Sequence, residues 1–508
     1  MVSCTINAKR ILGKRNKMIY GHFIEHFHRQ IYGGIYDPGS PFADKDGFRE
    51  DVIEALKQIR PPVLRWPGGC FASAYNWKKG VGPNRVPTLD KAWRVEEPNT
   101  FGTDEYIKLC RKLDCEPYIC TNAGTGTAEE MSDWVEYCNM EQEGLHAKSR
   151  IANGNTEPYK VKYWSIGNEN YGSWEIGAKT TVEWGRYVVE AAKMMKRVDP
   201  DIELSAAALT DIDWNINLLG SCGYLLDWIS IHEYWDRDRS IHLTNELATY
   251  EQVMCYTLSV NRSIERIRGI LTAMGLEKKI KISFDEWNLR AWYHPYILSV
   301  KFDTTKKEYL SLRDRNDDNS SYTMADAVFS ACFLNACNRN CDIVGMANFA
   351  PIVNTRGAIF THKGGIVKRT TYYVFDLYVN YLGDTVIDAW EGSKEYFIVT
   401  DKDGNEVEVD VLDILATFKP ETGEIAIAVV NKHPKEERVL SLIVNSFGRV
   451  GKCHMYSLSG KENDSFNDVD HNDAVIIRLD LNNNISDEGN DISINLQPHS
   501  VNIIVIGE

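Results

Sequence analysis

The chain has 508 residues, 43% hydrophobic and 25% charged, so it can bury the core of a large soluble protein. Its formal net charge of −15 argues against a nucleic-acid partner, because the phosphates would repel it. No segment reaches the ~20 apolar residues that span a membrane, and the first residues lack the apolar stretch of a secretory signal. We therefore expect a cytoplasmic protein with no membrane partner.

The 12 cysteines are scattered along the chain and do not form paired CxxC motifs. Such spacing favours reduced thiols in a cytoplasmic protein over a disulfide framework. The sequence also has no HExxH motif, EF-hand loop or phosphate-binding glycine motif in a strand–helix setting. We expect neither a metal site nor a cofactor.

Between Ile19 and about Gly383, apolar runs typical of strands alternate with amphipathic segments typical of helices. The predicted strands cover residues 18–25, 63–66, 117–121, 162–166, 202–207, 228–232, 280–284 and 343–347. The predicted helices cover residues 48–59, 105–113, 129–138, 181–198, 260–274, 324–338 and 371–382. Eight strands alternating with seven predicted helices indicate a (β/α)8 TIM barrel, whose functional residues lie at the C-terminal ends of the strands.

After Gly383 the pattern changes to short apolar runs without intervening helices, such as residues 425–430 and 439–444. Turn-rich stretches separate these runs, which is typical of an antiparallel β-sandwich, here expected to be jelly-roll-like. Residues 1–14 are predicted to add an N-terminal strand to this sandwich. The chain is thus expected to divide into residues 1–14, a catalytic barrel over 15–383 and a C-terminal β-sandwich over 384–508.

Two glutamates follow predicted barrel strands: Glu169 follows residues 162–166, and Glu286 follows residues 280–284. Two carboxylates presented by separate strands suit hydrolysis of a glycosidic bond, because one can protonate the leaving oxygen while the other attacks the sugar carbon. The alternative for either residue is an ion-paired glutamate at a strand end. Two glutamates in such similar settings favour catalysis.

Five segments in strand order carry a resemblance to a known family. They are Gly21-His22-Phe23-Ile24-Glu25-His26, Arg65-Trp66-Pro67-Gly68-Gly69, Ile166-Gly167-Asn168-Glu169, Ser230-Ile231-His232-Glu233-Tyr234 and Asp285-Glu286-Trp287-Asn288. With them the chain resembles glycoside hydrolase family 51, the intracellular α-L-arabinofuranosidases, over essentially its whole length. The resemblance implies a retaining barrel enzyme with catalytic glutamates on strands four and seven.

The resemblance implies that Glu169 is the acid/base and Glu286 the nucleophile. Arg65 and Tyr234 match residues that keep the nucleophile ionised, and Tyr234 is also expected to contact substrate. His232 is expected to support the surroundings of the nucleophile, with a buried structural histidine as the alternative.

Further positions match sugar-binding residues of the family: Glu25, Cys70, Trp93, Asn168, Tyr234 and Trp292. Asn168 is expected to hydrogen-bond the sugar 2-hydroxyl, although asparagine also forms turns at strand ends. Glu25 could instead form an ion pair with Arg29 or His26. Core packing is the alternative for Trp93.

Two positions depart from the family pattern. Cys70 stands where many members have an asparagine that touches substrate, and Pro351 replaces a glutamine. Both changes remove a hydrogen-bonding side chain and indicate a modified pocket. They leave open a retaining glycosidase of the same fold that acts on a β-xyloside or β-glucan. A non-catalytic carbohydrate-binding protein is a separate alternative, disfavoured because Glu169, Glu286 and Arg65 are all present.

The expected function is that of a retaining, exo-acting α-L-arabinofuranosidase. The substrates would be short arabino-oligosaccharides or arabinoxylan fragments carrying terminal arabinofuranose. The resemblance also implies a homo-oligomer, a hexamer, and no cofactor.

Overall fold

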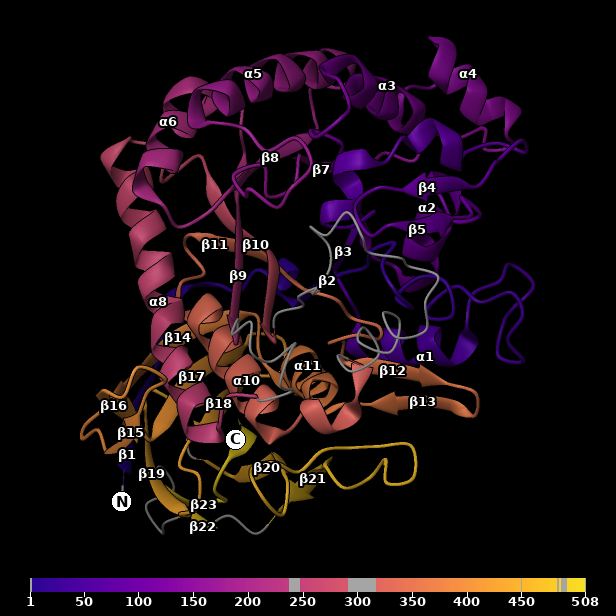
Figure 1. The fold of residues 1–508 in the computed structure, drawn as a ribbon. Helices are drawn as coiled ribbons and strands as arrows, with labels where there is room; N and C mark the ends of the chain where they lie inside the picture. Colours follow the sequence, from indigo (N-terminus) through magenta and orange to yellow (C-terminus); the bar gives the residue numbers. More distant parts are fainter. Residues whose placement is uncertain are drawn as a thin grey trace.

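The computed structural model describes residues 2–236, 247–290, 317–448, 450–481, 484–485 and 491–507. A barrel with helices around it lies next to a sheet-rich domain, and both marked chain ends lie in the sheet-rich domain (Figure 1). The predicted combination of an α/β barrel and a C-terminal β-domain is confirmed.

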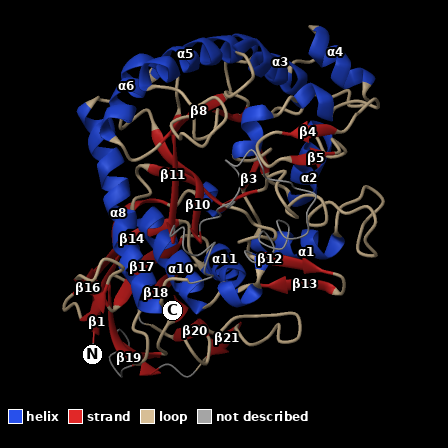
Figure 2. Ribbon diagram, viewed as in Figure 1, coloured by secondary structure: helices blue, strands red, loops and turns tan. Residues whose placement is uncertain are grey.

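Eight parallel strands close into the predicted barrel. In order around it they are β2 (Gly21–Phe23), β3 (Val63–Trp66), β6 (Glu116–Thr121), β7 (Tyr163–Ile166), β8 (Glu203–Ala208), β9 (Trp228–Asp236), β10 (Lys281–Arg290) and β11 (Val344–Phe349). The strands are largely buried because helices cover the outside of the barrel (Figure 2), so they consist mostly of continuous apolar runs.

The helices described around the barrel are α1 (Glu50–Ile59), α2 (Thr103–Leu113), α3 (Ala128–Asn139), α4 (Leu145–Ala152), α5 (Thr181–Val198), α6 (Ile212–Cys222), α8 (Tyr250–Ala273), α10 (Met324–Arg339) and α11 (Thr370–Tyr381). Helix α5 shows how the local sequence sets the two ends of such a helix. The hydroxyl of Thr180 accepts from the backbone N–H of Glu183, and the Glu183 side chain accepts from the Thr180 N–H. Asp199-Pro200 follows the helix at its C-terminal end, where proline prevents continuation.

Several elements differ from the predictions. Helices α4 and α6 were not predicted, and α8 begins at Tyr250 rather than at residue 260, capped by Thr249 and Gln252. Strands β9 and β10 are longer than predicted because they keep pairing as far as Asp236 and Arg290. A register shift between Phe284 and Glu286 interrupts this pairing next to one of the two key glutamates.

The second domain is a ten-stranded sheet in the order β21-β20-β24-β18-β17-β14-β1-β19-β23-β22. Its strands are β1 (Val2–Lys14), β14 (Thr385–Glu391), β17 (Leu412–Lys419), β18 (Glu424–Asn431), β19 (Arg438–Asn445), β20 (Lys452–Ser459), β21 (Ile476–Asp480), β22 (Asn484–Ile485), β23 (Asp491–Leu496) and β24 (Ser500–Gly507). All pairs are antiparallel except β1 and β19, which run parallel. One apolar cluster joins residues of β1, β19 and β23 to residues of β18 and β24, so distant parts of the sheet share one core.

Strand β1 lies between β14 and β19, which places the start of the chain inside the second domain. This pairing supports the proposed division into residues 1–14, 15–383 and 384–508. Helix α10, buried along nearly its whole length, contacts β10 of the barrel and also β17, β18 and β24 of the sheet. It therefore joins the two domains.

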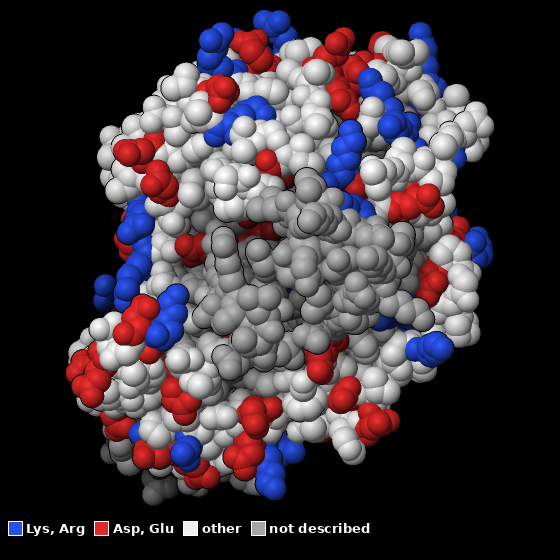
Figure 3. Space-filling view, in the orientation of Figure 1, with Lys and Arg blue, Asp and Glu red and all other residues white. Residues whose placement is uncertain are grey.

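Three short hairpins complete the fold. They are β4 (Thr88–Asp90) with β5 (Val95–Glu97), β12 (Ile359–His362) with β13 (Gly365–Lys368), and β15 (Tyr396–Thr400) with β16 (Glu406–Asp410). On the face seen in Figure 3, acidic and basic side chains are interspersed over the described surface. None of the helices that the structure describes is long and apolar enough to cross a membrane.

Candidate active site

Glu169 lies in a sharp turn just after β7, the fourth strand of the barrel. Gly167 and Glu169 both adopt left-handed backbone conformations, with φ of 72° and 43°. A Cβ at position 167 would lie 2.1 Å from Oδ1 of Asn170, so this turn requires glycine. The turn, rather than the strand itself, presents the Glu169 side chain.

Glu286 lies within β10, the seventh strand, and both of its carboxylate oxygens accept hydrogen bonds. Arg65 Nη1, from β3, donates to Oε1 at 2.7 Å, and the Tyr234 hydroxyl, from β9, donates to Oε2 at 2.7 Å. Arg65 is fully buried, and the Glu286 side chain is 8% exposed. A buried cation and a hydroxyl donor thus fix both oxygens of the Glu286 side chain.

The two carboxylates face each other across a histidine. His232 Nδ1 lies 3.2 Å from Oε1 of Glu169 and 3.7 Å from Oε1 of Glu286. One ring nitrogen of His232 and one carboxylate oxygen each of Glu169 and Glu286 all lie within 4.8 Å of one another. His232 therefore contacts the expected acid/base more closely than the expected nucleophile, although it was predicted to support the latter.

Asn168 and Arg65 link the two glutamate segments. Arg65 Nη2 donates to Oδ1 of Asn168 at 2.9 Å, while Nη1 of the same guanidinium binds Glu286. One rigid fork thus fixes the Asn168 amide relative to the Glu286 carboxylate.

Glu25 is held by neutral donors. Its Oε1 accepts from the backbone N–H groups of Gly69 and Phe71, each at 3.1 Å, and from the Trp93 indole at 3.0 Å. The alternative cationic partners lie elsewhere. His26 contacts Glu97 at 3.1 Å, and Arg29 donates to the carbonyl of Thr361 at 2.6 Å.

The main chain at Gly69 lies close to several of these groups. A Cβ built there would lie 2.9 Å from Oε1 of Glu286, 3.6 Å from Nδ2 of Asn168 and 3.6 Å from Oε1 of Glu25. Groups expected to bind and attack the sugar therefore surround one backbone position without a side chain.

Glu25 and Glu175, which lie beside the two glutamates, have carboxyl groups with raised pKa values. Burial, and then the charge of Glu286, raises the pKa of Glu25 to about 7, against the lowering effect of the Phe71 N–H and the Trp93 indole. Burial, and then the charge of Glu169, raises the pKa of Glu175 to about 8. Buried carboxyls that titrate near neutrality are typical of functional sites.

The shift at Glu25 predicts a pH-dependent stability. Its pKa is about 7 in the folded state against 4.5 for the free side chain, so the folded chain binds more protons between these values. The contribution of the protonated carboxyl is fully present below pH 4.5 and is lost as the pH rises to about 7. We expect Glu25→Gln to remove on the order of 3 kcal/mol of this pH dependence.

Denaturant unfolding of wild type and Glu25→Gln at both ends of this pH range measures the difference. The variant should gain stability relative to wild type as the pH rises. Parallel pH profiles for the two proteins would contradict the raised pKa.

Three residues near the carboxylates were not predicted from the sequence. Trp174 donates its indole N–H to Oε2 of Glu169 at 2.8 Å, and Arg356 donates to the Tyr234 hydroxyl at 3.1 Å. The third is Glu175, which is 5% exposed. Trp174 and Glu175 stand only five and six positions after Glu169 in the sequence, whereas nothing near Arg356 in the sequence indicates its place.

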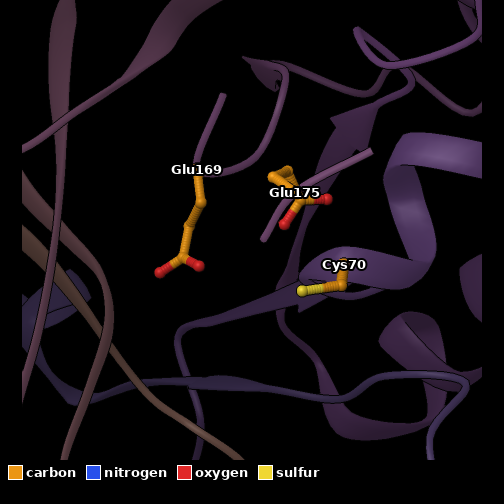
Figure 4. Close-up of side chains that lie close together, drawn as sticks. All are labelled: Cys70, Glu169 and Glu175. Carbon is orange, nitrogen blue, oxygen red and sulfur yellow. The ribbon is translucent and has the colours of Figure 1, made fainter. Parts of the chain in front are cut away.

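The two departures from the family pattern lie close to this centre. Cys70 is the first residue of a short 3-10 helix, Cys70–Ala74, that follows β3. Its Sγ lies within 4.8 Å of carboxylate oxygens of Glu169 and Glu175 (Figure 4). Burial, followed by the charges of Glu175 and Glu169, raises the pKa of Cys70. Pro351 is buried just after β11, next to Ala350, whose carbonyl accepts from Arg356 at 2.9 Å. The predicted Trp292 lies outside the described residues.

Two groups among the described residues have the donor types and spacing for a cation. One is Glu169, His232 and Glu286, and the other is Cys70, Glu169 and Glu175. In the first group both Glu286 oxygens already accept from Arg65 and Tyr234, so a cation would compete with the guanidinium. That group fits two catalytic carboxylates better than a metal centre.

Comparisons with known proteins agree with this geometry. The model of the α-L-arabinofuranosidase 1 domain matches residues 55–252, and that of the α-L-arabinofuranosidase C-terminal domain matches residues 285–500. The α-L-arabinofuranosidase C of Emericella nidulans is 35% identical over 480 residues, which covers 90% of this chain and 89% of the relative. An intracellular exo-α-(1→5)-L-arabinofuranosidase of Halalkalibacterium halodurans is 35% identical over 446 residues, covering 86% of each chain.

Solved structures give the same result. The α-L-arabinofuranosidase of Thermotoga maritima in complex with arabinose has a TM-score of 0.86 and 33% identity, covering 99% of both chains. The thermostable family 51 enzyme of Thermotoga petrophila has a TM-score of 0.85 and 33% identity, covering 100% of both chains. With the paired glutamates in place, the chain belongs to the α-L-arabinofuranosidases of glycoside hydrolase family 51, and it is a glycoside hydrolase.

Proposed function

We propose that this enzyme releases terminal α-L-arabinofuranose by a retaining double displacement. The observation that carries the proposal is the approach of Glu169 and Glu286 oxygens to within 4.8 Å. Retaining enzymes separate the carboxyl groups by about 5–5.5 Å, whereas inverting enzymes need about 6.5–9.5 Å to admit a water molecule. The observed spacing favours direct attack by the second carboxylate.

In the first step a Glu286 oxygen attacks the anomeric carbon while Glu169 gives its proton to the glycosidic oxygen. The bond to the leaving group breaks, the leaving group departs as an alcohol, and an ester joins the sugar to Glu286. Arg65 and Tyr234 each bind one oxygen of Glu286 and so orient it for attack. His232 and Trp174 hold the carboxyl of Glu169 in position.

In the second step Glu169, now a carboxylate, takes a proton from water. The resulting nucleophile attacks the anomeric carbon from the side of the departed group, and the ester bond to Glu286 breaks. The sugar leaves with the configuration it had in the substrate. Both glutamates return to their starting protonation states.

The sugar itself is proposed to bind between Glu169 and Glu286, next to the main chain at Gly69. Asn168 and Glu25 would bind its hydroxyl groups, Tyr234 and Cys70 would line the pocket, and Trp93 would form an aromatic wall. The hydrogen bond from Trp93 to Glu25 orients the two side chains together. Trp292 is proposed as a second aromatic wall of the sugar pocket.

We propose short arabino-oligosaccharides or arabinoxylan fragments as substrates, in a cytoplasmic enzyme that assembles as a hexamer. The Halalkalibacterium halodurans relative, named as intracellular and exo-α-(1→5)-acting, supports the substrate class and the location. The two alternatives, a β-xylosidase or β-glucanase and a non-catalytic binding protein, are not favoured. Similarity to a glucanase-xylanase, at 13% identity, reflects the shared fold alone.

The test is hydrolysis by the purified wild-type protein of aryl glycosides that differ only in the sugar. An aryl α-L-arabinofuranoside should be cleaved at least about 100-fold faster, in kcat/KM, than the matching β-xyloside or β-glucoside. A longer linear arabino-oligosaccharide should yield arabinose, and no disaccharide, as its first small product, as exo action requires. Preference for the β-xyloside, or no turnover by folded protein, would contradict the proposal.

A further inference from the structure

Three side chains beside the catalytic pair converge from two segments of the chain. Cys70 comes from the 3-10 helix after β3, and Glu169 and Glu175 come from the loop after β7. The sulfur and one oxygen from each carboxylate lie within 4.8 Å of one another, and Figure 4 shows the three side chains around a common space. The proposed double displacement gives no role to Glu175.

Glu175 provides a second, separate observation. The residue is only 5% exposed, and its Oε1 makes no well-formed hydrogen bond within the described residues, although the Ser73 hydroxyl and the Cys70 thiol interact with the carboxyl and lower its pKa. Its Oε2 accepts one long hydrogen bond, 3.4 Å, from Nδ2 of Asn168. A buried carboxyl oxygen without a well-formed hydrogen bond is costly unless a bound group satisfies it.

We propose that Cys70, Glu169 and Glu175 form a binding site for a thiophilic divalent cation such as Zn²⁺, and that its occupation inhibits the enzyme. One thiolate and two carboxylates are ligands that Zn²⁺ accepts, with water as the fourth ligand. Tetrahedral bonds of about 2.0–2.3 Å place ligand atoms about 3.5 Å apart, so rotations that bring the three atoms about 1 Å closer complete the site. The sulfur selects against Mg²⁺ and Ca²⁺, which prefer oxygen.

When the cation binds, the protons of the Cys70 thiol and of the Glu169 and Glu175 carboxyls pass to solvent, and the cation takes their place. It also occupies Glu169, which can then no longer give a proton to the leaving group. The expected inhibition depends on the proposed acid/base role of Glu169. Binding of the cation does not depend on that role.

The competing group of Glu169, His232 and Glu286 shares one ligand with this site but has no sulfur. Variants of Cys70 therefore distinguish the two. Cys70→Ser removes the sulfur with little change in size, and Glu175→Gln keeps the shape of the side chain but removes its charge. Cys255→Ser, on α8 and away from the site, is the matched cysteine control.

The test titrates chelator-treated protein with Zn²⁺ and Mg²⁺ by calorimetry, and with Co²⁺ by absorption, where a thiolate ligand gives an intense near-ultraviolet band. Wild type and Cys255→Ser should bind one Zn²⁺ per chain, show the thiolate band with Co²⁺ and bind Mg²⁺ at least 100-fold more weakly. Saturating Zn²⁺ should reduce kcat/KM at least tenfold, reversibly by chelator. Cys70→Ser should lose the band, and both site variants should bind Zn²⁺ at least tenfold more weakly.

Zn²⁺ binding and inhibition that are unchanged in Cys70→Ser would overturn the proposal and assign the cation to the His232 group. A chain that binds no Zn²⁺ would overturn it as well. A thiolate band and Zn²⁺ binding with unchanged kcat/KM would support the site but contradict the inhibition and the role of Glu169. Folding of each variant is checked by its thermal unfolding midpoint.

Discussion

Glu286→Gln is expected to lower kcat by about 10⁵-fold, because the amide cannot attack the anomeric carbon. The substitution keeps the size of the side chain and leaves an oxygen that can accept from Arg65 or Tyr234, which now bind the two carboxylate oxygens at 2.7 Å. We therefore expect the barrel to stay folded, unlike a truncation that would remove the carboxylate bound by the buried Arg65 guanidinium. Steady-state hydrolysis of an aryl α-L-arabinofuranoside measures the effect.

The matched control is Glu203→Gln. Glu203 also lies on a barrel strand, at the start of β8, but it pairs with Lys162 at 2.8 Å and accepts from the Trp228 indole at 2.8 Å. Its replacement should change kcat by less than about threefold, as for a residue away from the reacting atoms. Retention of more than about 1% of wild-type activity by Glu286→Gln would show that another residue is the nucleophile.

Glu169→Ala is expected to lower kcat/KM for arabino-oligosaccharides by about 10²–10⁴-fold, the usual contribution of a general acid. An alkoxide is a poor leaving group and needs the proton that Glu169 supplies. For an aryl arabinofuranoside with a strongly acidic phenol, kcat/KM should fall less than about tenfold, because that phenolate departs without protonation. The measurement is kcat/KM for a series of aryl leaving groups of increasing pKa.

In this series the variant should show a steep dependence on leaving-group pKa where the wild type shows a shallow one. Equal loss for all leaving groups would contradict the acid role and would indicate that Glu169 only binds the sugar. Trp174→Phe is the informative companion variant, since it removes the indole hydrogen bond to Glu169 but keeps an aromatic ring. Its effect should have the same sign as that of Glu169→Ala and be smaller.

The barrel could be predicted because its elements are defined locally. Residues 181–198 carry their own capping box and amphipathic face, and α5 has the predicted bounds. The ends of β9 and β10 could not be predicted, because those residues extend their strands by pairing with each other rather than through their own propensity. Helix α4 was missed because it has only 8 residues and buries only Ala147 and Arg150, which leaves a weak amphipathic pattern.

The candidate site divides in the same way. Glu169 and Glu286 could be found because each follows a recognisable apolar run, and the family motifs identify Arg65 and Tyr234. The contact of Arg356 with Tyr234 joins residues 122 positions apart and leaves no local pattern. The properties of Glu175 depend on burial and on the charge of Glu169, neither of which a sequence pattern provides.

The central claim is retention through a covalent intermediate on Glu286. The most direct measurement is the configuration of the arabinose first released from an aryl α-L-arabinofuranoside, followed by proton NMR before mutarotation. Release of the α anomer is the predicted result, because two displacements restore the original configuration. First release of the β anomer would show a single displacement and would contradict the account.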